Sequence, residues 1–478
     1  MNFLDILTHF SPNIMPLYMI WLLSDFDLRF ISKINKFWQS LKEDTLKGKT
    51  TRNILWLGLE RVVRLMVSVF TTALLARYLD LVSFGKLNFV LAFVSLFGLF
   101  TALGLKGIVV RELLRQPEGR FEILGTSFGL RLGMGLLTYV MSFALIRLLK
   151  PGDPQVALLV GIMALSLFLQ SFDVIDTWFK SLIEARNIVL VQNIASIVSS
   201  AVKIALIYIG ASLTTLVWAH LLEFGLVAIG YIILYKSKEN AFLRWSFNWK
   251  RAKFLIGQSW MMLFASGAAF IYTKIDLIML AKLASPESLG IYSATVRLAE
   301  VFDYIPLIIF TSVLPTAVAR YSESWRSFAL FTQKIFDFMI MIWLGISIMI
   351  TLTAPWLIGL IFGPKYQPAA QLLAVYIWGL FGSCLGLART IYVNVKNLYR
   401  VSLVVNLIGL VLNISLNLIL IPRFEALGAT VATLITYLVT TIVLNFYFRE
   451  FRVIAIFLQR ALQFNLSLPR LWRAIDAA

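Results

Sequence analysis

Charged side chains interrupt long apolar stretches of this sequence, and they are its clearest candidates for chemistry. The basic ones are Arg61, Arg64, Arg77, Arg131, Arg147, Lys203, Lys274 and Arg297. The acidic ones are Glu60, Asp173, Asp176, Glu223, Asp276, Glu300, Asp303 and Asp337. An ionised group within an apolar span is costly to insert, so such residues usually pair with each other or line a polar pathway.

The spacing of these charges places several of them on shared helical faces. Two polar stripes recur every three or four residues: Arg61, Arg64, Ser68 and Thr71, and then Ser293, Arg297, Glu300 and Asp303. Residues at that spacing lie on one side of a helix. Lys274 and Asp276 are two residues apart, so we expect each to find its partner on another helix. Arg77 and Arg147 lie near the ends of their apolar runs, where long side chains reach the membrane surface.

We predict a polar cavity lined by Arg61, Arg64, Lys274 and Arg297, whose positive charge favours an anionic substrate. The acids Asp276, Glu300 and Asp303 are predicted to couple transport to H⁺ or Na⁺. The alternative for any one of these residues is a buried salt bridge between packed helices. His220 and Glu223, three residues apart, are expected to interact, as a proton-responsive pair or as a packed histidine bonded to the glutamate.

The elements that must position these residues are membrane-spanning helices, since each apolar run has about the 20 residues needed to cross a bilayer. Hydrophobic residues make up 59% of the 478 residues and the mean hydropathy is +0.83. The sequence predicts an all-α polytopic membrane protein of about twelve spans: Asn53–Leu79, Leu87–Leu105, Phe128–Leu149, Gln155–Phe179, Ile188–Gly210, Leu213–Tyr235, Phe254–Leu283, Leu289–Val318, Ile335–Phe362, Pro368–Ala388, Arg400–Ile421 and Ala426–Phe448.

The loops between these runs alternate in charge. One side receives 30 of the 43 Lys and Arg residues. The other side receives five: Lys86, Lys150, Lys282, Lys365 and Arg423. Because basic loops stay in the cytoplasm, both termini are predicted to be cytoplasmic in a plasma (inner) membrane protein. The net charge of +18 follows these loops, so we expect membrane lipids as partners and no nucleic acid.

Few residues remain for enzymatic or metal chemistry. The sequence has one cysteine, Cys384, inside an apolar run, and two histidines, His9 and His220. We therefore expect no disulfide framework and no zinc motif, and we predict no catalytic, cofactor-binding or metal-ligating residue. We predict no ATP-binding P-loop, because Gly48-Lys49-Thr50 lacks the motif's first glycine, whose place is taken by Glu43.

The chain divides into two halves that resemble a repeat. The expected organisation is a cytoplasmic leader (1–52), a six-helix lobe (53–235), a cytoplasmic connecting loop (236–253), a second six-helix lobe (254–448) and a cytoplasmic tail (449–478). Ala76 and Gly85 in the first half correspond to Ala281 and Gly290 in the second, at a constant offset of 205 residues. Six spans in each half predict parallel repeats that are related by an axis along the membrane normal.

Two motifs carry a resemblance to a known family. The first motif consists of Leu74-Leu75-Ala76-Arg77-Tyr78-Leu79 followed by Phe84-Gly85. The second consists of Lys274-Ile275-Asp276 followed by Leu289-Gly290-Ile291-Tyr292-Ser293-Ala294. With its two six-helix halves, the chain resembles the polysaccharide and O-antigen (Wzx-type) flippases over about residues 48–450. Their superfamily includes multidrug extrusion transporters and lipid II flippases. The resemblance implies a V-shaped bundle whose central cavity opens alternately to each side and carries undecaprenyl-pyrophosphate-linked oligosaccharides outward for polysaccharide biosynthesis.

Other functions remain open at this point. A multidrug or cation extruder of the same superfamily would favour an acidic centre, and a membrane glycan polymerase or ligase would need a sizeable external loop, so both fit less well than a flippase. A scaffold without transport has no feature in its favour. The expected partners are a lipid-linked anionic oligosaccharide and the polysaccharide polymerase and glycosyltransferases that act on it.

Overall fold

The computed structural model describes residues 46–239 and 244–463. In this part of the chain the structure is helical, with no strand. Short 3₁₀ turns (η1, Pro117–Gly119; η2, Gln170–Phe172; η4, Pro364–Tyr366; η6, Arg449–Phe451) and a π-helical turn (η5, Val439–Val443) join or extend the α-helices. The helices are α3 (Leu46–Tyr78), α4 (Leu81–Ala102), α5 (Lys106–Arg115), α6 (Arg120–Leu149), α7 (Pro154–Ala164), α8 (Ser166–Leu169), α9 (Asp173–Ser181), α10 (Ala185–Tyr208), α11 (Leu213–Glu239), α12 (Trp249–Leu283), α13 (Pro286–Glu323), α14 (Trp325–Ile361), α15 (Ala369–Lys396), α16 (Tyr399–Leu438), α17 (Leu444–Tyr447) and α18 (Arg452–Leu462).

The number of spans agrees with the prediction of twelve. Nine helical segments of the described chain are long and apolar enough to cross a membrane. Two further helices, α3 and α12, have 33 and 35 residues, enough to cross as well. The longest of the nine, Tyr399–Tyr447, holds two predicted spans. The chain reverses within it at Glu425, which has φ 49° and ψ −126° and follows Pro422 by three residues.

Helix starts follow from local capping residues. The side chains of Ser285 and Ser324 accept hydrogen bonds from backbone N–H groups in the first turns of α13 and α14. Asn248 does the same at the start of α12. Such caps satisfy N–H groups that have no partner within the helix. The caps place the helix starts earlier than the predicted runs: α12, α13 and α14 begin five, three and ten residues before Phe254, Leu289 and Ile335.

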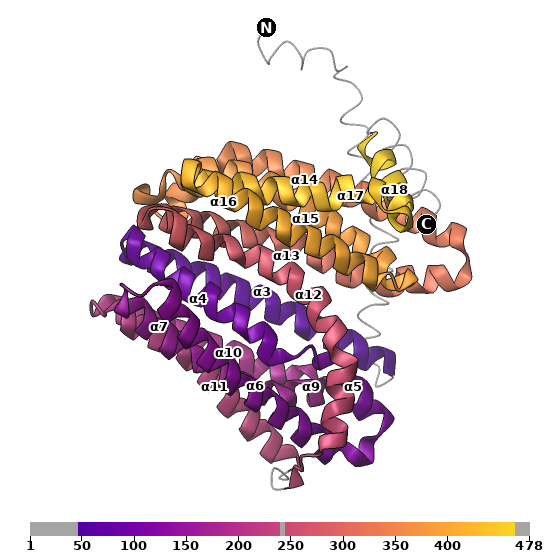
Figure 1. The fold of residues 1–478 in the computed structure, drawn as a ribbon. Coiled ribbons are helices and arrows are strands. Elements are labelled where there is room, and N and C mark those ends of the chain that lie inside the picture. The colour runs from indigo at the N-terminus through magenta and orange to yellow at the C-terminus, as the bar shows by residue number, and fades with distance from the viewer. Residues whose placement is uncertain (1–45, 240–243, 464–478) are drawn as a thin grey trace, which may run out of the picture.

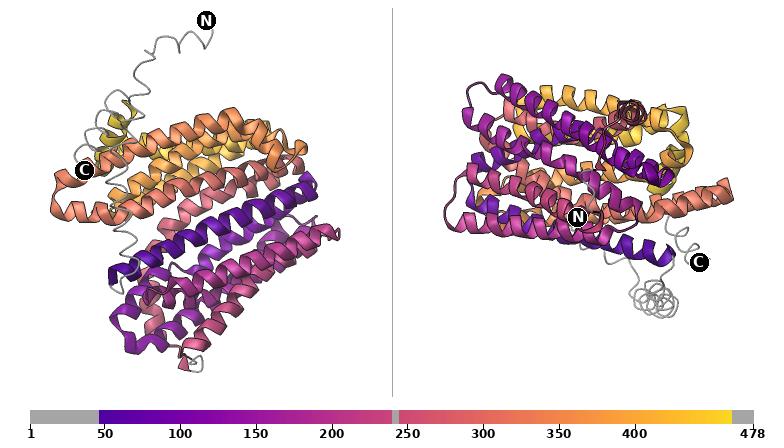
Figure 2. Two further views of the ribbon diagram at one scale, coloured as in Figure 1. Left: turned by 180° about the vertical axis from the view of Figure 1, so that it is seen from behind. Right: turned by 90° about the horizontal axis from the view of Figure 1, so that it is seen from below.

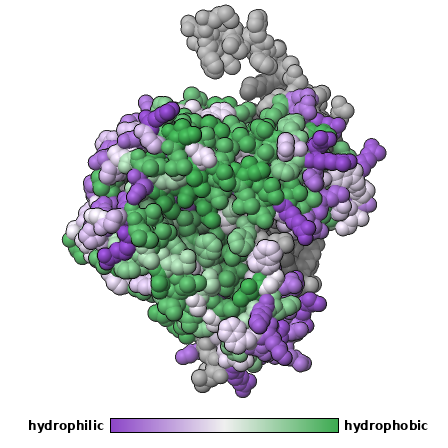
Figure 3. Space-filling view, in the orientation of Figure 1, coloured by the Kyte–Doolittle hydropathy of each residue, from purple (hydrophilic) through white to green (hydrophobic). Residues whose placement is uncertain are grey.

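The helices form two lobes that diverge toward one end of the bundle (Figure 1, Figure 2). Helices α3 to α11 make the N-terminal lobe and α13 to α17 make most of the C-terminal lobe. An apolar belt crosses the surface of the view in Figure 3, and polar side chains gather at its two edges. We name the edge that carries α5 and α18 the basic end, and the other the opposite end. Together these features identify a multi-pass membrane protein with two helical lobes.

The helix α12 connects the lobes and belongs to both. Its first half packs on the N-terminal lobe, where the backbone N–H of Asn248 donates to Thr126 (3.1 Å) and Arg251 pairs with Glu122 (3.1 Å). Its second half packs on α16, to which Tyr272 contributes an edge contact with Tyr437. The predicted leader, residues 1–52, lies mostly outside the described residues, as do 464–478 of the predicted tail.

The two lobes meet closely where α4 crosses α13. A Cβ added to Gly85 would lie 2.9 Å from the backbone nitrogen of Gly290, and one added to Gly290 would lie 2.1 Å from the carbonyl oxygen of Leu81. Only glycine permits this approach. Gly85 and Gly290 are the residues that the repeat makes equivalent, so they meet each other where the two halves join.

Candidate functional site

Four cavities lie between and within the lobes, and Arg297 lines all of them. The first, named here the polar cavity, has a volume of about 420 Å³. The second, the apolar cavity, has about 510 Å³. Two smaller cavities of about 140 Å³ each lie along α13, one against α3 and one against α4 and α12. Arg297 is therefore common to these four cavities, and its role in binding a substrate stays a prediction.

The guanidinium of Arg297 is held by groups from both lobes. Its Nε donates to Oδ1 of Asn88 on α4 over 2.7 Å, and its Nη1 lies 3.6 Å from Oε2 of Glu300 on its own helix. The side chain keeps 34% of its surface exposed. Arg297 can therefore meet a ligand while Asn88 and Glu300 fix its direction.

Lys274 reaches the same place from α12. Its ammonium forms an ion pair with Glu300, and both residues line one of the smaller cavities. Lys274 and Arg297 thus share one carboxylate. The prediction that Lys274 and Asp276 have separate partners on other helices is confirmed, because Asp276 accepts its hydrogen bonds elsewhere in the C-terminal lobe.

Arg64 faces these cavities from α3. It lines the polar cavity and one smaller cavity together with Ser68 and Thr72, one and two turns further along the helix. The predicted polar stripe on this helix therefore points inward. The side chain of Arg61 lies outside the described residues, and its predicted role stays a prediction.

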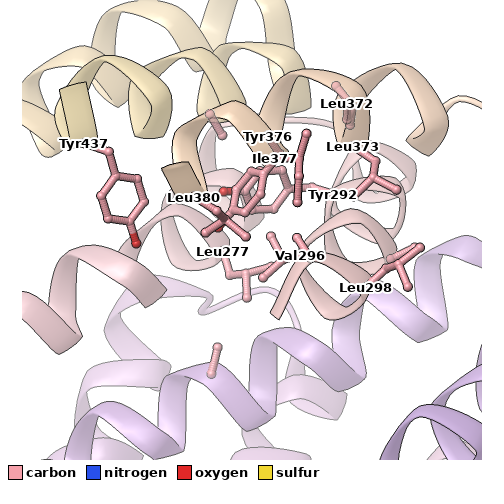
Figure 4. Close-up of a cluster of buried hydrophobic side chains, with 14 of the residues drawn as sticks. Leu277, Tyr292, Val296, Leu298, Leu372, Leu373, Tyr376, Ile377, Leu380 and Tyr437 are labelled. Atoms are coloured by element: carbon pink, nitrogen blue, oxygen red, sulfur yellow. The ribbon is translucent and has the colours of Figure 1, made fainter. Parts of the chain in front are cut away.

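Asp276 has a different environment from the cavity residues. It is 2% exposed and lines none of the four cavities. Its carboxylate accepts hydrogen bonds from Tyr292 (2.8 Å), from Asn417 (2.6 Å) and from Thr433. Tyr292 itself lies in a cluster of buried side chains with Tyr376 and Leu277 (Figure 4). Neutral donors thus hold this acid inside the C-terminal lobe.

The other two predicted coupling acids lie one turn apart on α13. Glu300 lines two of the cavities and is the shared partner of Lys274 and Arg297. Asp303 lines none of the four, and its Oδ1 is buried without a hydrogen-bond partner in the described part of the chain. The three acids therefore do not form one site.

Several cavity residues were not among the predicted site residues. Lys203 on α10 lies 3.5 Å from Glu223 on α11, and both line the polar cavity. The expected pairing of His220 with Glu223 is wrong, because Glu223 pairs with Lys203 and Nε2 of His220 has no hydrogen-bond partner within the described residues. Spacing along one helix favoured His220, whereas the partner comes from the neighbouring helix.

Two basic side chains join the lobes at the opposite end. Arg77, at the end of α3, donates to the carbonyl oxygens of Leu360 and of Ile361 (3.1 Å) at the end of α14. Lys365 donates in return to the carbonyl oxygens of Arg77 (2.9 Å) and Leu79. That Arg77 reaches the membrane surface stays a prediction: its side chain is exposed at this end, where it also binds carbonyl groups left unpaired at the end of the other lobe. We name this reciprocal contact the carbonyl latch.

Burial lowers the pKa of Lys365, and the nearby carboxylate of Asp80 opposes that effect. No group of three or more His, Cys, Asp or Glu side chains suited to a metal ion occurs among the described residues.

Two curated proteins are similar to this chain over about half of their length. Probable flippase AglR of Haloferax volcanii is 24% identical over 265 residues, which is 52% of each chain. Succinoglycan biosynthesis transport protein ExoT of Rhizobium meliloti is 25% identical over 271 residues, 56% of this chain and 54% of ExoT. The chain thus spans about half the length of these two relatives.

Solved structures share the fold. An inward-facing transporter of the multidrug resistance MATE family superposes with a TM-score of 0.65 and 15% identity, over 84% of this chain and 98% of that one. Lipid II flippase MurJ in an inward closed conformation gives a TM-score of 0.63 and 15% identity, over 86% and 92%. The chain therefore has the helical fold of the MATE-like transporters, as the resemblance implied.

The family described as "Polysaccharide biosynthesis protein" matches residues 74–371. This range holds the glycine contact between the lobes, the central residues Lys274, Arg297 and Glu300, and both parts of the carbonyl latch, whereas Arg64 lies before it. Since it covers well over half of the 478 residues, the protein belongs to that polysaccharide biosynthesis family.

Proposed function

We propose that the protein is a flippase, which moves undecaprenyl-pyrophosphate-linked oligosaccharide units across the plasma membrane for polysaccharide biosynthesis. The observation that carries this proposal is the cationic centre between the lobes. There Arg297 and Lys274 share a single acid, Glu300, and Arg297 lines the four cavities described above. A pyrophosphate would replace part of that pairing with charge-assisted hydrogen bonds.

The cargo has a charged, polar head and an apolar tail, and the central cations suit the head. A pyrophosphate and a glycan cannot cross hydrocarbon unaided, since buried unpaired charge is far more costly than buried paired charge. The polyprenyl tail has no such cost in the bilayer. The protein therefore has to shelter only the polar head, and Arg64, Lys274 and Arg297 supply its counter-charge, with Arg61 as a further predicted member of the set.

Transport proceeds by alternating access in this proposal. The lobes rock about the glycine contact of α4 and α13 and expose the central cavities to one side at a time. The basic end faces the cytoplasm, because its loops hold most of the Lys and Arg residues. Cysteines placed at Lys86 and Lys282 should react with an impermeant thiol reagent outside the cell, and those placed at Lys238 and Lys396 should not.

An ion gradient drives the cycle in this proposal, and the predicted coupling acids are Asp276, Glu300 and Asp303. Asp276 is the strongest of them, because its carboxylate is buried among neutral donors and Oδ1 of the adjacent Asn417 has no hydrogen-bond partner in the described structure. A proton or Na⁺ at Asp276 would neutralise the buried charge. Transport by reconstituted protein that ignores both pH and sodium gradients would contradict this coupling.

The alternatives are weaker. A drug or cation extruder needs acids at its centre, whereas Lys274 and Arg297 outnumber Glu300 there. We do not assign glycan polymerisation or a cofactor to this protein. We expect the polymerase and the glycosyltransferases of the same biosynthetic route as functional partners.

The test is translocation in proteoliposomes. Purified protein is reconstituted with a polyprenyl-diphosphate-linked oligosaccharide in one leaflet, and its arrival in the other is followed with an impermeant glycosidase or lectin. We expect the oligosaccharide to arrive faster than in protein-free vesicles, and we expect no transport of cationic dyes. Efflux of a cationic dye without movement of the lipid-linked oligosaccharide would favour the extruder and overturn the flippase.

A further inference from the structure

The polar cavity and the apolar cavity adjoin within the N-terminal lobe. They share six lining residues: Leu91, Gln170, His220, Glu223, Phe224 and Arg297. A ligand head at Arg297 therefore has direct access to both spaces. Together they could enclose a group the size of a sugar, since ligand cavities generally measure 300–1,000 Å³.

The remaining walls of the two cavities differ in chemistry. The polar cavity continues into hydroxyl and amide side chains: Ser68, Thr72, Asn88, Gln192, Ser196 and Ser200. The apolar cavity continues mainly into hydrocarbon: Val94, Leu99, Met163 and Phe270. A group that fills both must have one hydrogen-bonding edge and one apolar edge.

Two ion pairs of the N-terminal lobe bring charged side chains to the polar cavity, while Arg64 lines that cavity and also a smaller one together with Arg297. Lys203 lies 3.5 Å from Glu223, and Arg131 lies 3.6 Å from Asp173. Arg297, in contrast, shares Glu300 with a second cation. An anionic group is therefore best placed at Arg297, and a neutral group is best placed deeper in the lobe, because a further carboxylate there would compete for cations that are already paired.

His220 stands where the two cavities meet. Its Nε2 is buried and has no hydrogen-bond partner among the described residues. A buried polar atom without a partner costs free energy, and a ligand that pairs with it recovers that cost. Imidazole nitrogen pairs with an amide or a hydroxyl group according to its tautomer.

We propose that the sugar next to the diphosphate occupies both cavities and that His220 selects for a neutral N-acetylated sugar. The acetamido group combines an amide, which pairs with His220, and a methyl group, which enters the apolar cavity beside Phe224 and Phe270. This inference rests on the flippase function proposed above. It adds a specificity-determining residue and a class of sugar.

The test compares three cargoes that differ only in the proximal sugar. Proteoliposomes receive the same polyprenyl diphosphate linked to N-acetylglucosamine, to glucose or to glucuronic acid. We expect the N-acetylated cargo to move about tenfold faster than the other two, since one well-placed apolar or hydrogen-bonding group gives 10-fold or greater discrimination. Equal rates, or fastest movement of the glucuronic acid cargo, would overturn the inference while the flippase function stands.

Variants of His220 give the second readout. The readout is the ratio of the rate for the N-acetylated cargo to the rate for the glucose cargo. His220→Ala should bring this ratio close to one, whereas His220→Gln, which keeps a hydrogen-bonding amide, should retain part of the preference. Trp218→Ala, two residues away on the exposed face of α11, is the matched control for helix stability. A His220→Ala protein that keeps the full preference would overturn the inference. If wild type moves no cargo faster than empty vesicles, the flippase function fails and the inference fails with it.

Discussion

Two regions of the bundle hold ionisable side chains away from bulk water, and they do so in opposite ways. At the centre, Lys274, Arg297 and Glu300 pair with each other and keep between 21% and 34% of their side-chain surface exposed to cavities. In the C-terminal lobe, Asp276 is 2% exposed and has only neutral donors around it.

The difference indicates which charges are available to a cargo. Central side chains can exchange one partner for another, because water or a ligand reaches them through the cavities. Asp276 cannot reach a large anion, so it serves only the fold or a small cation. The same cost of burying charge thus leads to a binding surface in one region and to a closed polar cluster in the other.

The largest effect should come from removing the central cation. Arg297→Ala should lower the rate of oligosaccharide transport at least about 100-fold, since losing one partner of a desolvated charge pair costs about 2–5 kcal/mol. The amount of protein in the membrane should stay close to wild type, because Arg297 is only half-buried. Transport in proteoliposomes and quantitative immunoblots measure the two quantities.

Arg297→Lys is the control, since it keeps the charge but not the forked geometry, and it should retain an intermediate rate. If Arg297→Ala instead removed the protein from the membrane, Arg297 would have a structural role like that of Asp276, and the proposed difference between the two regions would be wrong.

In the C-terminal lobe we expect a substitution to affect stability. Asp276→Ala should reduce the free energy of unfolding by about 3 kcal/mol, because three hydrogen-bond donors lose their acceptor at once. Asp276→Asn, of nearly the same shape, should lose less. Thermal unfolding of the purified protein in detergent measures both, with Glu300→Gln as the comparison from the cavity. An Asp276→Ala protein as stable as wild type would show that the cluster does not support the fold.

Removal of the carbonyl latch, which joins the lobes, should have a smaller effect. Arg77→Ala combined with Lys365→Ala removes charged donors from the ends of α14 and α3, at about 1 kcal/mol for each lost hydrogen bond net of solvation. We expect the opposite end to open more often, by about fivefold or more. Spin labels on the two lobes at that end report it as a new longer distance. An unchanged distance distribution would mean that the glycine contact alone holds this end.

The smallest effect concerns Asp153, at the opposite end and outside the spans. Burial opposes its ionisation, but the backbone N–H of Val156 and the ammonium of Lys86, 3.2 Å away, lower its pKa below the usual value. A lowered pKa adds stability above the ordinary pKa of about 4 and loses it as the pH falls through the native value. Asp153→Asn should therefore cost about 0.5 kcal/mol at pH 7 and less at pH 4.

Thermal unfolding at the two pH values measures this difference. A larger cost at pH 4 than at pH 7 would have the wrong sign for a carboxylate that is stabilised in its ionised form.

Much of the fold was predictable because its cause is local. Apolar length and the residues at the ends of the runs predicted the spans, and even the reversal at Glu425 lies between two predicted runs. The inward direction of Arg64 and the separate partners of Lys274 and Asp276 followed from helical spacing.

The remaining features depend on how the helices are rotated relative to each other. The spacing of residues along one helix gives no information about that rotation. For this reason the pairing of Lys203 with Glu223 and the carbonyl partners of Arg77 were missed. The amphipathic helices α5 and α18 were missed as well, since they are too short and too polar to resemble spans.

The most direct test asks whether the cavities around Arg297 receive the anionic head of the cargo. Thr72 lines two of them beside Arg64 and Arg297, so Thr72→Cys in a Cys384→Ser background places a single reporter there. We predict that a water-soluble thiol reagent labels this cysteine in purified protein and that a polyprenyl-diphosphate-linked oligosaccharide slows the labelling, but not in the Arg297→Ala variant. A cysteine that is not labelled, or whose labelling the lipid-linked oligosaccharide leaves unchanged, would contradict a central binding site.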